Sequence, residues 1–266
     1  MDKKAIIESA IAFTQVCSQN YISEDVAICP EYVGMKLFEA PIFAFGAADD
    51  EIYTSYKSAG VIGGHFLTPA EWLPGARTVI SFFLPFTERI KSANSQGIEW
   101  PAKEWLHGRI EGQKLVVALS AHLNSLLLDA GYESLVPPID TRFKVGSGTS
   151  KFTSNWSERH AAFACGLGTF GLSRGLITNK GMCGRFGSVL TSLDLPADGR
   201  QYSDTYEYCI MCGLCAIQCP VNDISLEEGK KFTACSTFLD EVARIEKPRY
   251  GCGKCQVTVP CESERP

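Results

Sequence analysis

The chain has no excess of basic residues and no long run of apolar ones. Lys and Arg number 25 against 30 Asp and Glu, and the net charge of −5 gives no basic footprint for nucleic acid. The longest apolar stretch, 78–86, falls well short of the roughly 18 residues that a membrane helix needs. Glu8 interrupts the apolar segment 5–13, which favours an amphipathic helix over a signal peptide. We therefore expect a cytoplasmic protein that binds neither nucleic acid nor a membrane.

Cysteine, in contrast, is abundant. Of the 12 cysteines, four form Cys209-Ile-Met-Cys212-Gly-Leu-Cys215-Ala-Ile-Gln-Cys219-Pro220, the C-x2-C-x2-C-x3-C-P run of bacterial ferredoxins. Three thiolates at this spacing can bind three corners of one [4Fe–4S] cluster, and the fourth cysteine of such a run ligates a neighbouring cluster. The run therefore predicts a second set of cysteines, and the chain supplies it as Cys235, Cys252, Cys255 and Cys261.

Simple counting divides these eight cysteines into two sets of four. Cluster one takes Cys209, Cys212 and Cys215 with the remote Cys261, and cluster two takes the remaining four, Cys219, Cys235, Cys252 and Cys255. The alternatives are structural zinc, disulfides and buried free thiols. Zinc favours two separated C-x2-C pairs around one ion, and disulfides need an oxidising compartment. Because Cys261 follows a proline and lies unusually far from Cys255, one cluster with a degenerate second site stays an alternative.

Hydrophobic patterning divides the chain into an α/β domain at 1–200 and a cluster-binding module at 201–266. Thr68, Pro69 and Glu71 carry the marks of a helix start, with a cap, a proline at the first helical position and a glutamate three residues after the cap. The pattern predicts three longer helices and three strands. The helices are expected at 2–19, 104–130 and 156–165, and the strands at 40–46, 78–84 and 186–195.

The hexapeptide Gly166-Leu-Gly168-Thr-Phe-Gly171 matches the G-x-G-x-x-G dinucleotide fingerprint. That fingerprint works only where it follows a strand and opens a helix. Here the expected helix at 156–165 comes before the glycines, and the residues after Gly171 do not continue as a helix. We interpret the motif as a glycine turn that ends a helix.

Several segments together resemble a known family. Glu158-Arg-His-Ala-Ala-Phe-Ala-Cys-Gly-Leu-Gly-Thr-Phe-Gly171, Leu176-Ile-Thr, the segment 187–196 and the double set of cysteines are similar to the core shared by epoxyqueuosine reductase and the corrinoid reductive dehalogenases. The similarity runs from about Trp72 to Cys261. It implies an α+β fold in which a nitroreductase-like α/β core domain holds cobalamin and a ferredoxin-like module with two [4Fe–4S] clusters passes electrons to the cobalt.

The resemblance also assigns site residues. Cys235 corresponds to the family's extra ligand to the second cluster, and the cobalamin contacts near that cluster fall on Thr237, Cys252 and Gly253. Arg159 and His160, just before the glycine turn, are further candidates for cofactor binding. Adjacent side chains on a helix point in different directions, so they are not all expected to face one cavity. Arg159 suits a corrinoid amide or an anionic substrate, with an ordinary salt bridge as the alternative.

The sequence also departs from the family pattern. The aspartate that serves as proton donor in epoxyqueuosine reductase falls near Phe152 here, and the nearest acid upstream is Asp140, so the catalytic residue is unknown. There is no D-x-H-x-x-G corrinoid motif. The family enzyme that acts on tRNA continues into a helical-repeat domain, whereas this chain ends at Pro266, and we therefore expect no action on tRNA.

We expect an iron–sulfur oxidoreductase. In this hypothesis an external donor of the ferredoxin or flavodoxin type delivers single electrons, which pass through two [4Fe–4S] clusters to bound cobalamin for a reductive reaction on a small molecule. One alternative is a non-catalytic electron carrier or reductive activator that docks on a corrinoid protein. Another is a sensor whose cluster responds to oxygen or iron.

Overall fold

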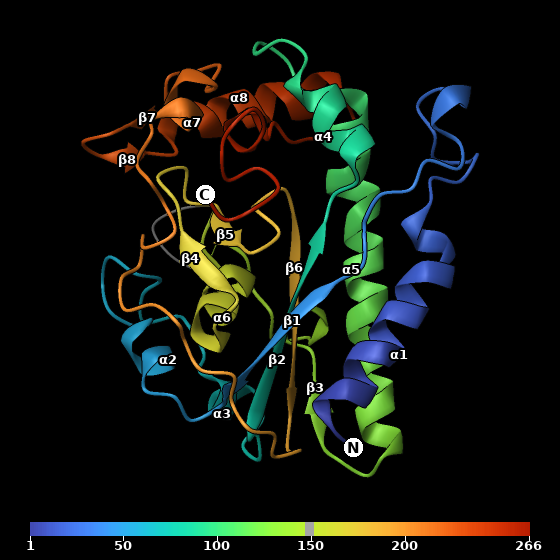
Figure 1. Ribbon diagram of the computed structural model, residues 1–266, viewed down its shortest axis with the longest axis vertical. Helices are drawn as coiled ribbons and strands as arrows, with labels where there is room; N and C mark the ends of the chain where they lie inside the picture. Colours follow the sequence, from blue (N-terminus) through green and yellow to red (C-terminus); the bar gives the residue numbers. More distant parts are fainter. Residues whose placement is uncertain (147–151) are drawn as a thin grey trace.

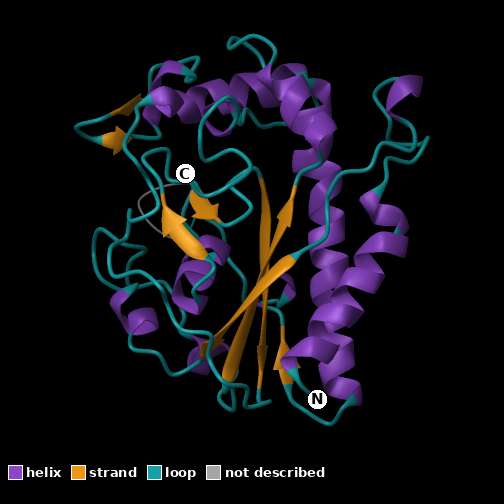
Figure 2. Cartoon of the chain, viewed as in Figure 1, coloured by secondary structure: helices purple, strands orange, loops and turns teal. Residues whose placement is uncertain are grey.

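The computed structural model describes residues 1–146 and 152–266 and has three layers, closed at one end by the cysteine-rich tail (Figures 1 and 2). The middle layer is an antiparallel sheet with strand order β1-β2-β6-β3. Helices α1 and α5 cover one face, and α6 lies on the other. The α+β class expected from the sequence is therefore confirmed. These elements are β1 Ile42–Ala47, β2 Thr78–Pro85, β3 Ser134–Leu135, β6 Gly184–Thr191, α1 Lys3–Val16, α5 Lys103–Asp129 and α6 Glu158–Cys165.

Strand β2 is buried on both of its sides. Ile80, Phe82 and Leu84 pack with α1 and α5 in one hydrophobic cluster, whereas Val79 and Phe83 pack with α6 in a second. The alternation follows from the two-residue period of a strand. The sheet thus separates two apolar layers, which explains why 78–84 reads as a continuous apolar run.

The predicted helix starts and the long central helix are confirmed with small shifts. Thr68 caps the short helix α3 (Pro69–Trp72), and its backbone N–H donates to the Glu71 carboxylate at 2.7 Å. The predicted helix 104–130 is α5. The predicted helix 2–19 is α1, which ends earlier, at Val16, because a separate 3-10 turn follows at Ser18–Asn20.

The glycine motif after α6 ends that helix, as predicted. Gly166 has a φ of +96°, the left-handed conformation that glycine adopts without strain. The chain then forms the hairpin of β4 (Gly168–Phe170) and β5 (Leu176–Thr178). Strand β6 ends at Thr191, before the predicted Leu195. Thr191 pairs with Thr78, the first residue of β2, so no partner strand continues beyond it.

The tail lies across one end of the three layers, next to α4 (Glu88–Ser95) (Figure 1). It contains three short helices and a small hairpin. These elements are α7 Leu214–Ile217, α8 Thr233–Ile245, the 3-10 turn Lys254–Gln256, and the strands β7 Ile224–Ser225 and β8 Gly229–Lys230.

Two buried networks fasten the tail to the helices beneath it. Arg249 donates to both carboxylate oxygens of Glu111 on α5, at 2.9 and 3.0 Å, and His107 lies 2.9 Å from the same carboxylate. Burial opposes the charge of Glu111, but the hydrogen bonds from His107 and Arg249 outweigh it and lower its pKa. The fully buried Lys254 donates to the carbonyls of Asn94, Gln96 and Gly97 at the end of α4.

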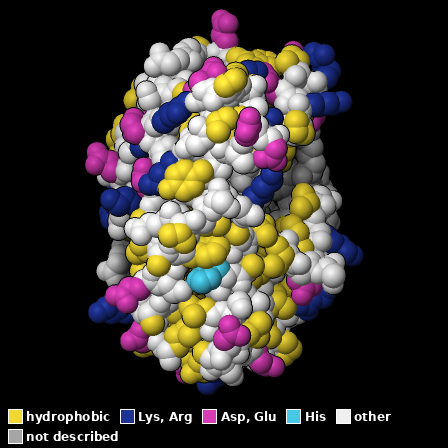
Figure 3. Space-filling view, turned by 90° about the vertical axis from the view of Figure 1, so that its right-hand side faces the viewer, with side chains coloured by type: hydrophobic (Ala, Val, Ile, Leu, Met, Phe, Trp, Pro, Cys, Tyr) yellow, Lys and Arg dark blue, Asp and Glu magenta, His cyan; other side chains and the backbone are white. Residues whose placement is uncertain are grey.

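Within the described ranges, no helix combines the length and hydropathy that crossing a membrane requires. Figure 3 views the face that carries α1, where hydrophobic side chains lie among charged groups of both signs. This face therefore presents no extended basic area, in keeping with the balanced charge of the sequence.

Candidate functional site: two sets of cysteines and a cavity

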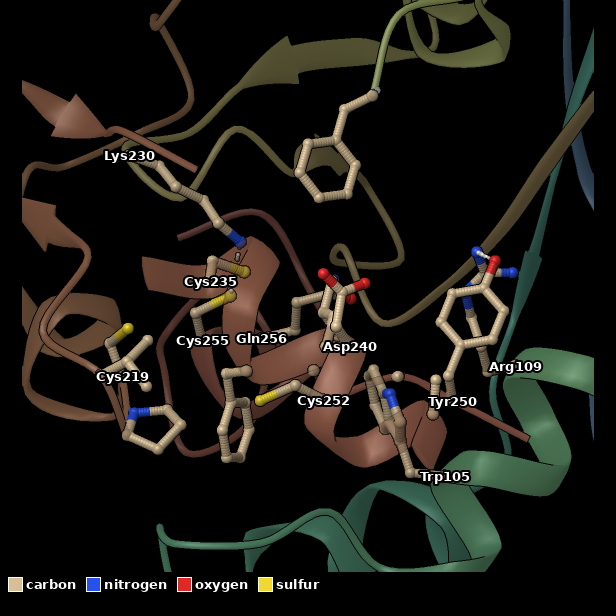
Figure 4. Close-up of a pocket in the computed structure, with 18 of the residues that line it drawn as sticks. Trp105, Arg109, Cys219, Lys230, Cys235, Asp240, Tyr250, Cys252, Cys255 and Gln256 are labelled. Carbon is tan, nitrogen blue, oxygen red and sulfur yellow. Dashed lines mark hydrogen bonds between the residues drawn. The ribbon is translucent and has the colours of Figure 1, made fainter. Parts of the chain in front are cut away.

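A cavity of about 580 Å³ lies between the tail and the amino-terminal part of α5 (Figure 4). This is within the range of small-molecule sites. Its walls come from α5, α8, the end of β8 and the segment 250–256. We call it the central cavity. Its lining is Trp105, Arg109, Val145, Phe152, Cys219, Pro220, Val221, Lys230, Cys235, Phe238, Leu239, Asp240, Ala243, Tyr250, Gly251, Cys252, Gly253, Cys255 and Gln256.

Four of the eight tail cysteines line this cavity, and they are the four assigned to cluster two by counting. Cys219 follows α7, and Cys235 lies in the first turn of α8. Cys252 comes just before the 3-10 turn Lys254–Gln256, and Cys255 lies within it. The ammonium of Lys230 lies 3.8 Å from the Cys255 sulfur, and the backbone N–H of Asp223 donates to the Cys219 sulfur at 3.3 Å. Both donors suit a charged thiolate.

Gly253 explains the local path of this ligand loop. Its φ is +66°, and a Cβ at this position would lie 1.9 Å from the indole ring of Trp105. Only glycine therefore fits between Cys252 and Lys254. The close contact with Trp105 holds this loop against α5. Cys252 and Cys255 therefore line the same cavity as the α5 side chains.

The other four cysteines line a second, much smaller cavity of about 20 Å³. Cys209, Cys212 and Cys215 come from the ferredoxin run, in which Gly213 has a left-handed conformation that starts α7. Cys261 arrives from the end of the tail, and its carbonyl accepts from the backbone N–H of Met182 at 2.9 Å. Cys212 is exposed, whereas Cys215 is buried.

The thiols influence one another within each set. Burial raises the pKa of Cys261 to about 12, with further increases from Cys209, Cys215 and Cys212. Burial likewise raises the pKa of Cys252 to about 12, with further increases from Cys255 and Cys235. Neutral thiols are therefore favoured in the protein alone. Burial disfavours the charged thiolate, and the positive charge of bound iron would stabilise it, so the two sets of thiols suit cluster binding.

The alternatives named from the sequence can be compared with these positions. All 12 cysteines are free, so none of them forms a disulfide. In residues 1–146 and 152–266, no group of three or more His, Cys, Asp or Glu side chains has the arrangement of a single-ion site. A cubane cluster distributes four thiolates over four iron atoms, whereas zinc gathers them on one ion.

The candidate cofactor contacts are distributed unevenly around the central cavity. Cys252 and Gly253 line it. Thr237 is exposed on α8, and its hydroxyl donates to the Thr233 carbonyl. His160 lies outside the lining, between the rings of Tyr56 and Phe170. Burial and the neighbouring Arg159 lower the pKa of His160 to about 3.

Arg159 is open to solvent near the second set of cysteines. It donates to the Arg174 carbonyl. Although the residue is exposed overall, burial of its guanidinium lowers its pKa, and the Cys255 thiol opposes that shift. Asp140 is bound by Arg142 at 2.9 Å and lies outside the cavity lining, so a salt bridge accounts for it.

The sequence did not single out several of the polar groups that line the cavity. Arg109 lies four residues after Trp105 and therefore on the same face of α5. A charged residue on an inward-facing side of a helix was the signal that could have identified it. Lys230, Asp240 and Tyr250 come from separate parts of the tail. Phe152, near which the sequence resemblance places the family's proton donor, lines the cavity as an aromatic ring.

Comparison with known proteins supports an iron–sulfur site and identifies the fold. Residues 203–225 match a family described as a 4Fe-4S binding domain, which covers the ferredoxin run. No curated protein matches the chain in sequence at a significant level. The chain therefore carries a 4Fe–4S binding domain, and the cysteines from Cys209 to Cys219 lie within it.

Solved structures of two kinds of reductase share the fold. An epoxyqueuosine reductase with an epoxyqueuosine-modified tRNA-Tyr stem loop aligns over 97% of this chain and 66% of its own, at 18% identity and a TM-score of 0.52. The Bacillus subtilis epoxyqueuosine reductase aligns over 84% and 62%, at 19% identity and 0.50. A catabolic reductive dehalogenase aligns over 84% and 30%, at 17% identity and 0.51.

These similarities define the fold as that of the epoxyqueuosine reductases and reductive dehalogenases, as the sequence resemblance predicted. The chain spans slightly less than two thirds of the length of the reductases and under a third of the dehalogenase.

Proposed function

We propose that the chain is an iron–sulfur oxidoreductase that transfers single electrons from an external donor, through two [4Fe–4S] clusters, to an acceptor in the central cavity. The observation that carries this proposal is the division of the eight tail cysteines between two cavities, four at each. The division supports cluster one at Cys209, Cys212, Cys215 and Cys261. It supports cluster two at Cys219, Cys235, Cys252 and Cys255.

The positions of the two sets favour a direction of electron flow. Cys212 is exposed, and it is flanked by Ile210 and Met211, which are 59% and 43% exposed. A donor of the ferredoxin or flavodoxin type could therefore approach cluster one. The second set lies against the central cavity, where a bound acceptor would receive the electron. We propose this order of transfer and a reducing, cytoplasmic setting for the free thiols.

We further propose cobalamin as the acceptor. Its amide groups need donors and acceptors, which Arg109, Asp240 and Gln256 offer, and Trp105 provides a flat apolar wall. A whole corrinoid is bulkier than a cavity of about 580 Å³, so binding requires that part of it stay outside this lining. When bound, the clusters would supply a one-electron relay and cobalamin a low-valent cobalt centre.

The chain's own residues have distinct tasks in this scheme. The two sets of thiolates bind the clusters, and Lys230 offsets negative charge at the second set. Asp240 and Tyr250 present a carboxylate and a hydroxyl to the cavity, where each can hold a proton for a reductive step. A small-molecule substrate fits this space, and we propose that tRNA is not the substrate.

Anaerobic reconstitution tests the proposal. We expect about eight iron and eight sulfide per chain, and one corrinoid co-eluting after incubation with hydroxocobalamin. About four iron would reduce the relay to one cluster. Eight iron with no corrinoid would instead favour the non-catalytic carrier that docks on a corrinoid protein. A folded protein that binds no iron would refute the proposal, including the sensor alternative.

A further inference from the structure

The segment 181–183 belongs to the α/β domain and contacts the ligand loops of both sets of cysteines. It comes directly before β6, and the Cys183 carbonyl accepts a hydrogen bond from the backbone N–H of Phe86, the residue after β2, at 2.9 Å. Cys183 is 1% exposed and packs in the same hydrophobic cluster as Val257 of the tail. The segment is therefore attached to the packed central sheet, and such an element holds what it contacts in a defined place.

On one side, the segment holds the remote ligand of cluster one. Met182 lines the small cavity of the first set, and its backbone N–H donates to the carbonyls of Cys261 and Glu262 at 2.9 and 3.2 Å. Gly181 has a φ of +71°, and a Cβ at this position would lie 2.2 Å from the Glu262 carbonyl oxygen. Only glycine permits this close contact. The position of Cys261 is thus set by the α/β domain as well as by its own loop.

On the other side, the segment holds a ligand loop of cluster two. The Cys183 thiol donates to the Gln256 carbonyl at 2.9 Å, and Gln256 directly follows Cys255. Burial raises the pKa of Cys183 well above its ordinary value, and the thiols of Cys255 and Cys261 raise it further. One thiol from each set therefore acts on Cys183, which itself stays protonated, as a hydrogen-bond donor must.

The two sets are also joined within the tail. Cys215 of the first set lies on α7, and Cys219 of the second set follows that helix. A single short helix leaves two clusters free to pivot about it. The segment 181–183 supplies a second connection, between Cys261 and Cys255, and two connections define a separation and an orientation. Electron transfer between two centres slows steeply as their separation grows, so a relay depends on such a constraint.

We propose that the segment 181–183 fixes the separation of the two clusters, and that Cys183 is a positioning residue for electron transfer between them. Its thiol holds the loop that carries Cys255, whereas Met182 holds Cys261. This inference rests on the proposed function, because it requires two clusters. It deepens that function by naming the part of the α/β domain that sets the distance between the clusters.

Removal of the thiol donor tests the proposal. Cys183→Ala and Cys183→Val cannot donate to the Gln256 carbonyl, whereas Cys183→Ser can. Cys165→Ala is the matched control, since Cys165 is also 1% exposed and its thiol donates to the Val79 carbonyl in the other apolar layer. Each protein is reconstituted anaerobically, its iron is counted and both clusters are reduced. Electron paramagnetic resonance then measures the magnetic splitting between the clusters, which depends on their separation and orientation.

We expect the wild type, Cys183→Ser and Cys165→Ala to share one splitting. Cys183→Ala and Cys183→Val should show a weaker splitting at an unchanged iron content of about eight per chain. Loss of cluster two from these two variants, with retention in Cys183→Ser, would support the same role of the thiol. The valine variant fills most of the space that alanine leaves empty, so it separates the lost donor from the lost packing.

A wild-type splitting in folded Cys183→Val with about eight iron would overturn the positioning role and leave the two-cluster proposal intact. A lower Tm with an unchanged splitting would show that Cys183 only packs, which also overturns it. If the alanine and valine variants do not fold, a changed splitting in Cys183→Ser would contradict the proposal, and a retained one would support it. About four iron in the wild type would refute the relay and this inference together.

Discussion

The ammonium group of Lys230 lies 3.8 Å from the sulfur of Cys255, on the cysteine side of the central cavity. It also lies 5.2 Å from the centre of the Phe232 ring, so it is held between an aromatic face and the second set of thiols. A fixed positive charge beside a cluster stabilises the reduced form, which carries one more negative charge than the oxidised form.

We therefore predict that Lys230→Met lowers the midpoint potential of cluster two. The expected change is on the order of 100 mV, from one charge at a few ångströms in a partly buried site. A potentiometric titration followed by electron paramagnetic resonance would measure it. Lys231→Met is the matched control, since Lys231 pairs with Glu228 at the surface. An unchanged potential in Lys230→Met would show that this charge does not act on the cluster.

The pairing of the cysteines predicts selective losses. Cys261→Ala should remove cluster one and leave about four iron per chain, because this residue is the remote ligand of the first set. Cys252→Ala should remove cluster two and leave the same amount of iron with a different spectrum. Cys29→Ala, outside both sets, should retain about eight. Survival of both clusters in Cys261→Ala would contradict the assignment.

The buried ammonium of Lys254 predicts a large effect on stability. Lys254→Met would leave three carbonyls at the end of α4 without their donor, at a cost of about 3 kcal/mol. For a chain of this size we expect Tm to fall by roughly 6–12 °C. The exposed Lys4→Met, which removes only a surface pair with Glu8, should change Tm little. Thermal unfolding by circular dichroism measures both variants.

Glu158 predicts a stability that falls as pH rises. Burial raises its pKa to about 7 in the folded state, against about 4.3 in an unfolded chain. The folded state therefore binds this proton more tightly. Its stabilisation is complete below about pH 4 and is lost progressively as the pH rises to about 7.

Glu158→Gln cannot ionise and should remove this loss. We expect the variant to gain stability over the wild type on the order of 2 kcal/mol at pH 8, and much less at pH 5. Tm measured for both proteins at the two pH values gives the comparison. A difference that is the same at pH 5 and pH 8 would show that Glu158 does not titrate in this range.

Local signals in the sequence predicted most of the framework. The cap at Thr68, the terminator at Gly166 and the apolar run of β2 each depend on a few adjacent residues, so they could be found without a structure. The end of β6 could not be found in this way. It depends on where β2 begins, and that information lies far away in the chain.

The candidate site, too, could be predicted only where its residues follow a local sequence pattern. The ferredoxin run is a contiguous spacing, and simple counting then grouped the remaining cysteines as the two cavities do. Arg109 and Tyr250 are separated by 141 positions and meet where the tail packs on α5, beside the ion pair of Arg249 and Glu111. No pattern within a short window contains that contact. The acid at the cavity is likewise Asp240, on α8, whereas sequence proximity pointed to Asp140.

The order of the cysteines along the chain has a consequence for biogenesis. In the proposed assignment, the first three ligands of cluster one come before every ligand of cluster two, and its fourth ligand, Cys261, comes after them all. All ligands of cluster two thus lie between the third and the fourth ligand of cluster one in the sequence. During translation, all four ligands of cluster two are present on the nascent chain before Cys261, the fourth ligand of cluster one, has been added. Cluster two can therefore be loaded first. Local opening of the segment that carries Cys261 would correspondingly release iron from cluster one and leave cluster two in place.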